Sequence, residues 1–198
     1  MATKKKQPEA IYQLKVTLAG SKPPIWRRLL VPADMTLGTL HVVLQVAMGW
    51  TNSHLHDFDI DSVTYGEPNP EDRAMGLTHT RNERTARLSR VLGYVGARGT
   101  YTYDFGDGWE HKLVVEKILP PVPGYPYPAC IAGKRNCPPE DCGGVGGYED
   151  LLEVLADPDH EEHEERLEWV GERFDPEAFD LIGINEALAN LQQRQPGI

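Results

Sequence analysis

Residues 100–118 read Thr-Tyr-Thr-Tyr-Asp-Phe-Gly-Asp-Gly-Trp-Glu-His-Lys-Leu-Val-Val-Glu-Lys-Ile and carry the clearest fold signal in the chain. Two runs of alternating apolar and polar side chains flank Asp107-Gly108. Such alternation is typical of half-buried strands, and Asp-Gly favours a tight turn between them. The stretch therefore predicts a β-hairpin.

The length of the turn decides which side chains face each other. A two-residue turn at 107 and 108 pairs Gly106 with Trp109 and places Asp104 opposite His111. Facing residues have Cβ atoms about 5 Å apart, so Asp104 and His111 could hydrogen-bond. An aspartate that orients a histidine serves general-base catalysis and metal sites. A longer turn would shift this register, and the pair could equally be a plain surface contact.

The residues before the hairpin continue the sheet pattern. Residues 11–31 contain two more strand-like runs, separated by glycine and prolines. Apolar positions at helical spacing over 37–48 predict a helix, which Asp34 or Thr36 can cap. Residues 54–61 alternate again and predict another strand. We therefore expect a sheet with one helix packed on it.

The residues between and after these elements predict loops and helices. Residues 62–80 are typical of a loop, and a short helix follows at about 83–92. Five prolines within 120–128 indicate an irregular connection. Three helices are then expected: from residue 151 to a stop at Asp157-Pro158, from about 160 to 169, and from about 185 to 193.

This order of elements favours the α+β class, with an N-terminal, mostly antiparallel sheet packed by one main helix and followed by a C-terminal helical lobe. We expect a flexible tail at 1–9 and a single domain over 10–198. Within it the sheet part covers about 10–119, the proline-rich connection 120–137 and the acidic lobe 138–198.

The charge is unevenly distributed along the chain. The 198 residues contain 30 Asp and Glu against 20 Lys and Arg, so the net charge is −10. Residues 149–180 hold 14 of the acids and only two of the bases, and the remainder is slightly positive. The acidic total therefore does not exclude nucleic-acid contacts by the first part.

Composition excludes several protein classes. Hydrophobic residues at 40% and charged residues at 25% are ordinary globular values, which argues against disorder. No apolar run reaches the roughly 20 residues that span a bilayer, so we expect no membrane partner. Three cysteines are compatible with a reducing compartment, and we expect a cytoplasmic location.

Several polar residues could form a metal or catalytic site. His54 and His56 are two apart on the predicted strand and share one of its faces. Together with His111 they could hold a divalent cation, with Asp104 orienting His111 and Asp141 acting as base or ligand. The alternative is that the histidines are partly buried and satisfied by neighbouring groups.

Arg81, Arg84, Arg87 and Arg90 are each three residues apart, so on a helix they would spread over about half of its circumference. This diffuse basic patch could contact phosphates of a nucleic acid. The alternative is that these arginines pair with the acidic lobe of the same chain.

Several motifs in this order resemble one known family. They are Pro24-Ile-Trp26-Arg27-Arg28, His54-Leu-His56-Asp-Phe58, Tyr103-Asp-Phe-Gly-Asp107-x-Trp109-x-His111, Pro138-Pro-Glu-Asp-Cys-Gly-Gly144 and Trp169-x-Gly171. The chain resembles the plasmid pRiA4b open-reading-frame-three-like family over nearly its whole length. The resemblance implies a compact α+β domain carried on chromosomes, on plasmids and as a passenger of some insertion sequences. It implies no established activity.

The resemblance supports one common site, because its matched polar positions are those selected above, together with Asp107 and Glu140. Our leading hypothesis is a binding or accessory module for an unidentified ligand or protein partner. Its pocket would lie between the sheet and the loop 138–144. We expect this pocket to be lined by Asp107, Trp109, Glu140, Gly143 and Gly144.

Two other functions remain open. One is a metal-assisted enzyme of the hydrolase type that uses the His/Asp cluster. The other is nucleic-acid binding through the arginine patch. The residue patterns of serine and tyrosine recombinases are not recognisable in the sequence.

Overall fold

The structure is a computed structural model that describes residues 8–67, 80–171 and 174–194. Within these ranges eight strands form one sheet, in the order β5-β4-β3-β6-β7-β1-β2-β8. Neighbouring strands are antiparallel, except that β4 and β5 are parallel. The strands are β1 (Ile11–Leu18), β2 (Trp26–Pro32), β3 (His56–Ile60), β4 (Val63–Gly66), β5 (Arg81–Asn82), β6 (Arg98–Tyr103), β7 (Trp109–Leu119) and β8 (Ala129–Lys134).

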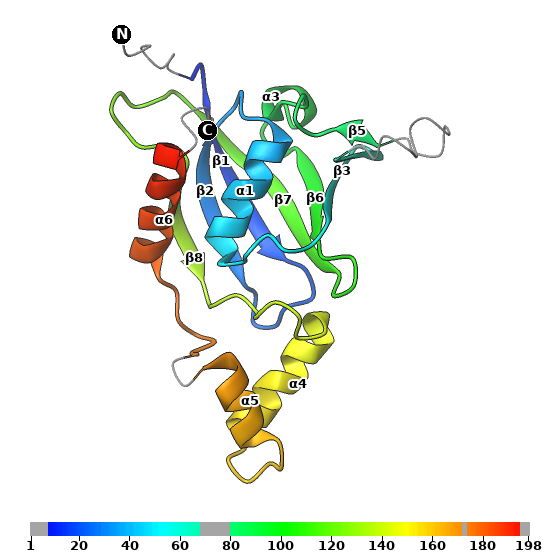
Figure 1. The fold of residues 1–198 in the computed structure, drawn as a ribbon. Coiled ribbons are helices and arrows are strands. Elements are labelled where there is room, and N and C mark those ends of the chain that lie inside the picture. Colours follow the sequence, from blue (N-terminus) through cyan, green and yellow to red (C-terminus); the bar gives the residue numbers. More distant parts are fainter. Residues whose placement is uncertain (1–7, 68–79, 172–173, 195–198) are drawn as a thin grey trace.

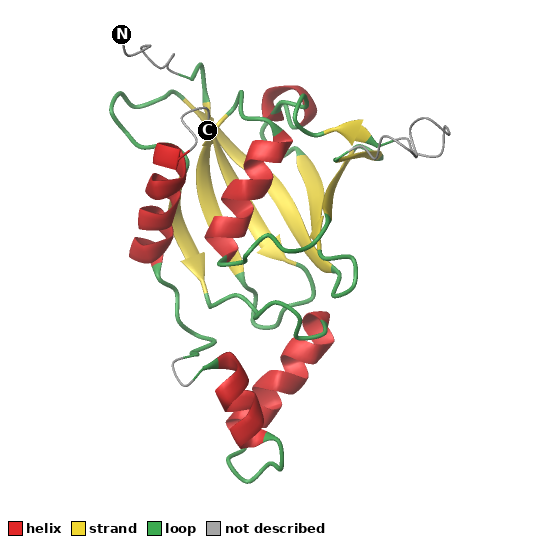
Figure 2. Ribbon diagram, viewed as in Figure 1, coloured by secondary structure: helices red, strands yellow, loops and turns green. Residues whose placement is uncertain are grey.

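The helices lie in two places. They are α1 (Leu37–Met48), α3 (Leu88–Val91), α4 (Gly144–Ala156), α5 (His163–Val170) and α6 (Leu181–Arg194). Figure 1 shows α1 and α6 on one face of the sheet, and α4 with α5 beyond its end. Figure 2, from the same viewpoint, shows the sheet as one continuous layer behind α1. The architecture confirms the predicted α+β class and the mostly antiparallel sheet.

The core lies between the sheet and α1. Alternation along β1 and β7 places Val16 and Leu113 at full burial, whereas the neighbouring Lys112 is exposed. At the start of α1 the backbone N–H of Thr39 donates to the side chain of Thr36, so Thr36 is the cap. The helix is thereby held over β6 and β7, where the polar residues of interest lie.

The hairpin register differs from the predicted one. Tyr103 pairs with Trp109 and Tyr101 pairs with His111, so the turn comprises residues 104–108. Asp104 leaves the strand because it adopts a left-handed conformation, with φ 55°, and its carboxylate accepts from the backbone N–H of Gly106 at 2.9 Å. The longer turn shifts the register, and the predicted pairing of Asp104 with His111 is therefore wrong.

His111 is instead a core residue with 0% exposure. Its ring lies edge-on to that of Trp50, with 5.2 Å between the centroids, and its Nδ1 lies 3.3 Å from the carbonyl oxygen of Tyr101. Burial lowers the pKa of His111 to about 4, so the imidazole is neutral near pH 7. Its side chain is enclosed by the core and does not reach the surface.

The last helix, α6, does not belong to the helical lobe that was predicted for residues 138–198. α6 packs against β8 and α1 and not against the acidic helices. Asn185 of α6 accepts from the backbone N–H of Cys130 at 2.9 Å and donates to the Cys130 carbonyl at 2.8 Å, and Leu188 is fully buried. The helical lobe beyond the sheet therefore consists, in its described part, of α4 and α5.

Two connections also contain more strand than predicted. β8 lies within the expected irregular segment 120–137, because the prolines end at Pro128 and leave the next residues free to pair with β2. Residues 81–82 form β5 beside β4, and only the single turn α3 is present within the expected helix at 83–92. β4 itself falls in the predicted loop 62–80, of which 68–79 lie outside the described residues, as do residues 1–7 of the predicted tail.

None of the helices in the described ranges is long and apolar enough to cross a membrane.

The buried histidine makes stability depend on pH. The pKa of His111 is about 4 in the folded chain against an ordinary value of 6.5, so on acidification the unfolded chain binds a proton first. Stability should therefore fall between about pH 6.5 and 4, by up to about 1.4 kcal/mol per pH unit for this group. Urea denaturation at several pH values measures this slope.

The variant His111→Phe should reduce the slope by up to about 1.4 kcal/mol per pH unit, because the titrating group is lost while an aromatic side chain stays beside Trp50. The part of the slope that comes from His41, whose pKa is also lowered to about 4, should remain. The matched control is His160→Gln, which changes an exposed histidine. A slope in His111→Phe equal to that of the unchanged chain would show that His111 is not the source of the acid sensitivity.

Candidate functional site

The loop 138–144 is attached directly to the end of the sheet. The indole Nε1 of Trp50 donates to the carbonyl of Pro138 at 3.0 Å. The carboxylate of Glu140 accepts from the backbone N–H and the hydroxyl of Thr51, and also from the hydroxyl of Tyr103. Burial alone would raise the pKa of Glu140, but these hydrogen bonds outweigh it and hold the pKa below its ordinary value. Glu140 is therefore an ionised anchor for the loop.

The hydroxyl of Tyr103 joins this loop to the segment before β3. It accepts from the backbone N–H groups of Ser53, at 2.9 Å, and His54, at 3.3 Å, while it donates to Glu140. Burial, together with the neighbouring Glu140, raises the pKa of Tyr103 to about 12, so the hydroxyl keeps its proton. One side chain thus fixes the positions of His54 and of the loop 138–144.

The expected pocket residues mostly make this attachment. Asp107 accepts from the backbone N–H of Gly143 at 3.2 Å, and Trp109 is fully buried. A Cβ atom on Gly144 would lie 2.4 Å from the carbonyl oxygen of Asp107, so the two backbones are in close contact. Glu140 is the third anchor. The loop is packed against the hairpin turn at this point.

Three predicted residues meet beside the attached loop. His54, which precedes β3, lies with its Nε2 3.1 Å from Oδ1 of Asp141 and its Nδ1 3.7 Å from Oδ2 of Asp104. One ligand atom from each of the three residues can be chosen so that all lie within 4.8 Å of one another. Imidazole nitrogen with two carboxylate oxygens is a donor set that divalent metal ions accept.

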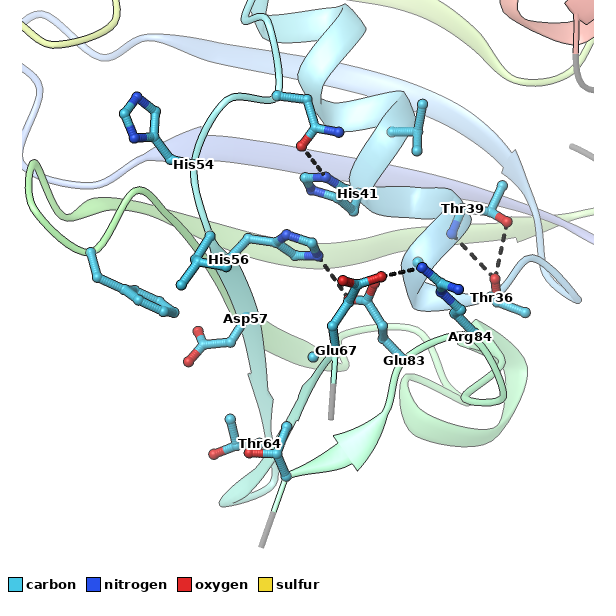
Figure 3. Close-up of a pocket in the computed structure, with 17 residues that line it drawn as sticks. Thr36, Thr39, His41, His54, His56, Asp57, Thr64, Glu67, Glu83 and Arg84 are labelled. Atoms are coloured by element: carbon cyan, nitrogen blue, oxygen red, sulfur yellow. Dashed lines mark hydrogen bonds and ion pairs between the residues drawn. The ribbon is translucent and has the colours of Figure 1, made fainter. Parts of the chain in front are cut away.

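A cavity of about 840 Å³ opens next to this cluster, with His54 in its wall. It lies between the first half of α1, strands β3 and β4, and residues 80–84 (Figure 3). Polar side chains supply much of its lining, among them Thr36, Thr39, His41, His56, Asp57 and Glu83. This cavity offers room for a small molecule, and a second one of about 400 Å³ lies between α4 and residues 160–169. None of the five expected pocket residues lines the first cavity.

A stacked pair of histidines forms one wall of the cavity. The rings of His41 and His56 are parallel within 1°, with 3.4 Å between their centroids. Nε2 of His56 lies 2.8 Å from Oε2 of Glu83, a carboxylate that is almost fully buried. Figure 3 shows the Glu83 side chain directed toward His56 and away from His54. Within the pair, His41 is positioned by α1, to which it belongs, and His56 is positioned by its contact with Glu83.

His41 belongs to a closed ring of four hydrogen bonds. The backbone N–H of Asn52 donates to Oε1 of Gln45 at 3.0 Å, and Nε2 of Gln45 donates to the Tyr101 hydroxyl at 2.9 Å. The Tyr101 hydroxyl donates to Nδ1 of His41 at 2.8 Å, and Nε2 of His41 donates to Oδ1 of Asn52 at 2.7 Å. Burial, with the neighbouring His56 adding to it, lowers the pKa of His41 to about 4. Both nitrogens of this neutral imidazole are therefore occupied.

The structure does not bring His54, His56 and His111 together. His54 faces Asp104 and Asp141, His56 faces Glu83, and His111 lies in the core beneath Trp50. The predicted three-histidine site is thus divided among three surroundings. Of the residues expected to be catalytic, Asp104 and Asp141 are together, whereas His111 is separate.

The four arginines of the basic patch do not share a helix. Arg81 lies in β5 and Arg84 in the turn after it, while Arg87 and Arg90 lie at the cap and inside α3. The guanidinium of Arg84 pairs with Glu67, and that of Arg87 donates to the carbonyl of Asp34. The helical spacing on which the patch was predicted is therefore not present, and phosphate contact by these side chains remains a prediction.

The sequence analysis missed His41, Gln45, Asn52, Glu83 and Tyr101. Two signals were present. His41 and Gln45 are four residues apart in a helix, so they form a polar pair beside the apolar stripe of α1. Glu83 is the lone acid among the arginines of residues 80–98, which marks it as a paired group.

The close contact between Gly144 and Asp107 allows a test of whether the loop 138–144 packs against the hairpin turn. Gly144→Ala should lower the free energy of unfolding by more than about 1 kcal/mol, because φ is +71° and the new methyl would overlap Asp107. Gly146→Ala should leave it unchanged or raise it, because a Cβ there meets nothing within 4 Å and alanine favours a helix. Urea denaturation compares them, and equal effects would contradict the observed packing.

Comparisons with known proteins agree on one family. The family model described as plasmid pRiA4b ORF-3-like protein matches residues 10–182. The uncharacterized protein y4hQ of Sinorhizobium fredii (strain NBRC 101917 / NGR234) is 43% identical over 183 residues, which cover 92% of each chain. The crystal structure of MM3350, a protein of unknown function from Methanosarcina mazei Go1, matches with a TM-score of 0.81 and 41% identity over 88% of this chain and 97% of that one. This chain belongs to the plasmid pRiA4b ORF-3-like family.

Proposed function

We propose that this chain is a binding domain, and that its ligand is a small polar molecule held in the cavity between α1, β3, β4 and residues 80–84. One observation carries the proposal, namely a cavity of about 840 Å³ walled by the stacked His41–His56 pair and Glu83. Cavities of several hundred cubic ångströms with a few convergent polar groups are the usual form of small-molecule sites.

The charges of the cavity indicate what kind of ligand fits. Asp57, Glu67 and Glu83 line it, and Arg84 is the one arginine or lysine among the described lining residues. Arg84 is already paired with Glu67. Burial, with the charge of Asp59 adding to it, raises the pKa of Asp57. Hydrogen-bond acceptors are thus in excess, which favours a ligand that carries donors such as amino or hydroxyl groups.

The rim of the cavity adds an apolar feature. Leu55 and Phe105 both line the cavity and are 72% and 55% exposed, although they are large apolar side chains. The backbone N–H of Asp104, next to Phe105, donates to the carbonyl of Leu55 at 2.8 Å, which holds the two segments side by side. An exposed apolar pair at the mouth of a polar cavity favours a ligand whose polar end enters and whose apolar part stays at the rim.

Hydrogen bonds within the chain hold part of the cavity wall in place. The closed ring of hydrogen bonds fixes His41 to Asn52 and to Tyr101, and the parallel stack transmits that position to His56. Because these side chains are already ordered, binding loses little further conformational freedom. This favours recognition by shape and hydrogen bonding over a large rearrangement.

A ligand screen tests the proposal. Primary amines, amino alcohols and polyols with short apolar chains would be tested by saturation-transfer-difference NMR. Binding compounds would then be located by the shifts of backbone amides. We expect at least one compound to shift the amides of residues 36–41, 55–57 and 83–84. Binders that shift only amides elsewhere, or a panel without any binder, would reject the cavity as the site.

Matched variants sharpen the test. Glu83→Gln should weaken such binding about ten-fold or more, because it replaces a carboxylate acceptor of the cavity wall with an amide, and a lost hydrogen bond of about 1.4 kcal/mol is a factor of ten. Glu110→Gln changes an exposed carboxylate on β7 and should leave the affinity unchanged. Asp57→Asn supplies a second cavity variant if Glu83→Gln unfolds, and unchanged affinity in that variant would count against the proposal.

A further inference from the structure

We propose that His54, Asp104 and Asp141 bind one divalent transition-metal ion at the mouth of the cavity. The three residues come from three separate connections: the segment before β3, the β6–β7 turn and the loop before α4. The inference is independent of the proposed cavity ligand, because all the donor atoms that it needs belong to the chain. The cluster lies at the mouth of the cavity because His54 lines it and Asp104 directly precedes the lining residue Phe105.

The spacing of the donor atoms fits a single ion. Nε2 of His54 and Oδ1 of Asp141 are 3.1 Å apart. Two neighbouring ligands of one octahedral ion, with bonds of about 2.1 Å, lie about 3.0 Å apart. A carboxylate oxygen of Asp104 completes a set whose members all lie within 4.8 Å of one another. Asp141 faces Nε2 of the His54 ring and Asp104 faces Nδ1, so Asp104 must turn toward the Nε2 side for one ion to contact all three residues.

Asp104 provides an independent indication that a cation belongs here. The residue is only 8% exposed, and its Oδ1 accepts from the backbone N–H of Gly106. Its Oδ2 has no hydrogen-bond donor within 3.5 Å among the described residues, and the nearest charged partner is Nδ1 of His54 at 3.7 Å. A largely buried carboxylate is stabilised by nearby positive charge, and Oδ2 of Asp104 faces His54 of the same cluster.

The negative charge around the cluster also favours a bound cation. Asp104 and Asp141 face His54, and Asp107 and Glu140 lie in the same two segments, the β6–β7 turn and the loop 138–144. In the part of the chain that the structure describes, no lysine or arginine forms an ion pair with any of these four carboxylates. A divalent ion would balance this group, which His54 alone does not.

The donor set narrows the choice of metal. One imidazole with two carboxylates suits Zn²⁺, a borderline ion, and the harder Mn²⁺, which prefers oxygen ligands, better than Ca²⁺, which takes oxygen ligands. Asp141 is 71% exposed and His54 30% exposed at the side chain, so water has access to the remaining coordination positions. An ion held by three protein ligands with open positions can also bind a polar group of a second molecule.

The experiment uses tag-free full-length chain that has been stripped with a chelator and then dialysed. Mn²⁺ is titrated and the free ion is followed by electron paramagnetic resonance, while Zn²⁺ is titrated by calorimetry. We expect one ion per chain for at least one of the two metals. Failure of both metals to bind in a one-to-one ratio would overturn the proposal.

Conservative variants assign the site. Asp141→Asn and Asp104→Asn should each weaken binding at least ten-fold, because each removes a charged ligand. Both residues have positive φ, 61° and 55°, a conformation that asparagine tolerates, so the backbone should be kept. The control is Asp61→Asn, an exposed aspartate with φ 51° in the β3–β4 turn. Equal affinity in all three variants would overturn the assignment.

Two further measurements separate this site from other outcomes. His54→Gln should weaken binding as the aspartate variants do, whereas the exposed His160→Gln should not. Thermal unfolding in chelator shows whether a variant is folded, and Asp141→Asn should match the unchanged chain because its side chain is exposed. Loss of metal binding in a folded Asp141→Asn variant supports the metal site. Binding of amines to the cavity is measured separately, in the presence of chelator, so that it does not depend on a bound metal ion.

Discussion

Two tyrosines on one face of β6 hold the polar region together. Tyr101 and Tyr103 are two residues apart, so both point toward α1 and the segment that follows it. The hydroxyl of Tyr101 enters the ring with His41, and that of Tyr103 joins Ser53 and His54 to Glu140. A slip of the β6–β7 register by one residue would turn both side chains to the opposite face. The cavity wall, the His54 cluster and the attached loop all depend on this register.

Local signals were enough to predict several of the elements, and long-range packing decided their final arrangement. β1, the α1 helix with its Thr36 cap and the two strands of the hairpin follow from alternation, helical spacing and capping within a few residues. The packing of α6 against β8 and α1 does not follow from local signals. An apolar stripe shows which face of a helix is buried, but not which element covers it. β8 was hidden because the prolines before it dominate the composition of the segment.

The candidate site was predicted residue by residue but not as an assembly. His54, Asp104 and Asp141 were each selected from the sequence, yet they were divided between two roles, and His56 and His111 were added. The error has one origin: alternation was extended to residues that lie outside regular strands. His54 precedes β3 and Asp104 has left the strand with φ 55°, so neither follows the rule that assigns a face to each strand residue. Turn conformations of this kind depend on tertiary contacts that a single sequence does not display.

The four hydrogen bonds in the ring around His41 can be donated in only one direction around that ring. Hydroxyl groups, side-chain amides and neutral imidazoles can each exchange the direction in which they donate, but the backbone N–H of Asn52 cannot. Because that peptide group begins the ring, Gln45, Tyr101 and His41 must all donate in the same direction around it. His41 is therefore held in one tautomer, and both of its ring nitrogens are engaged within the protein, however close it lies to His56.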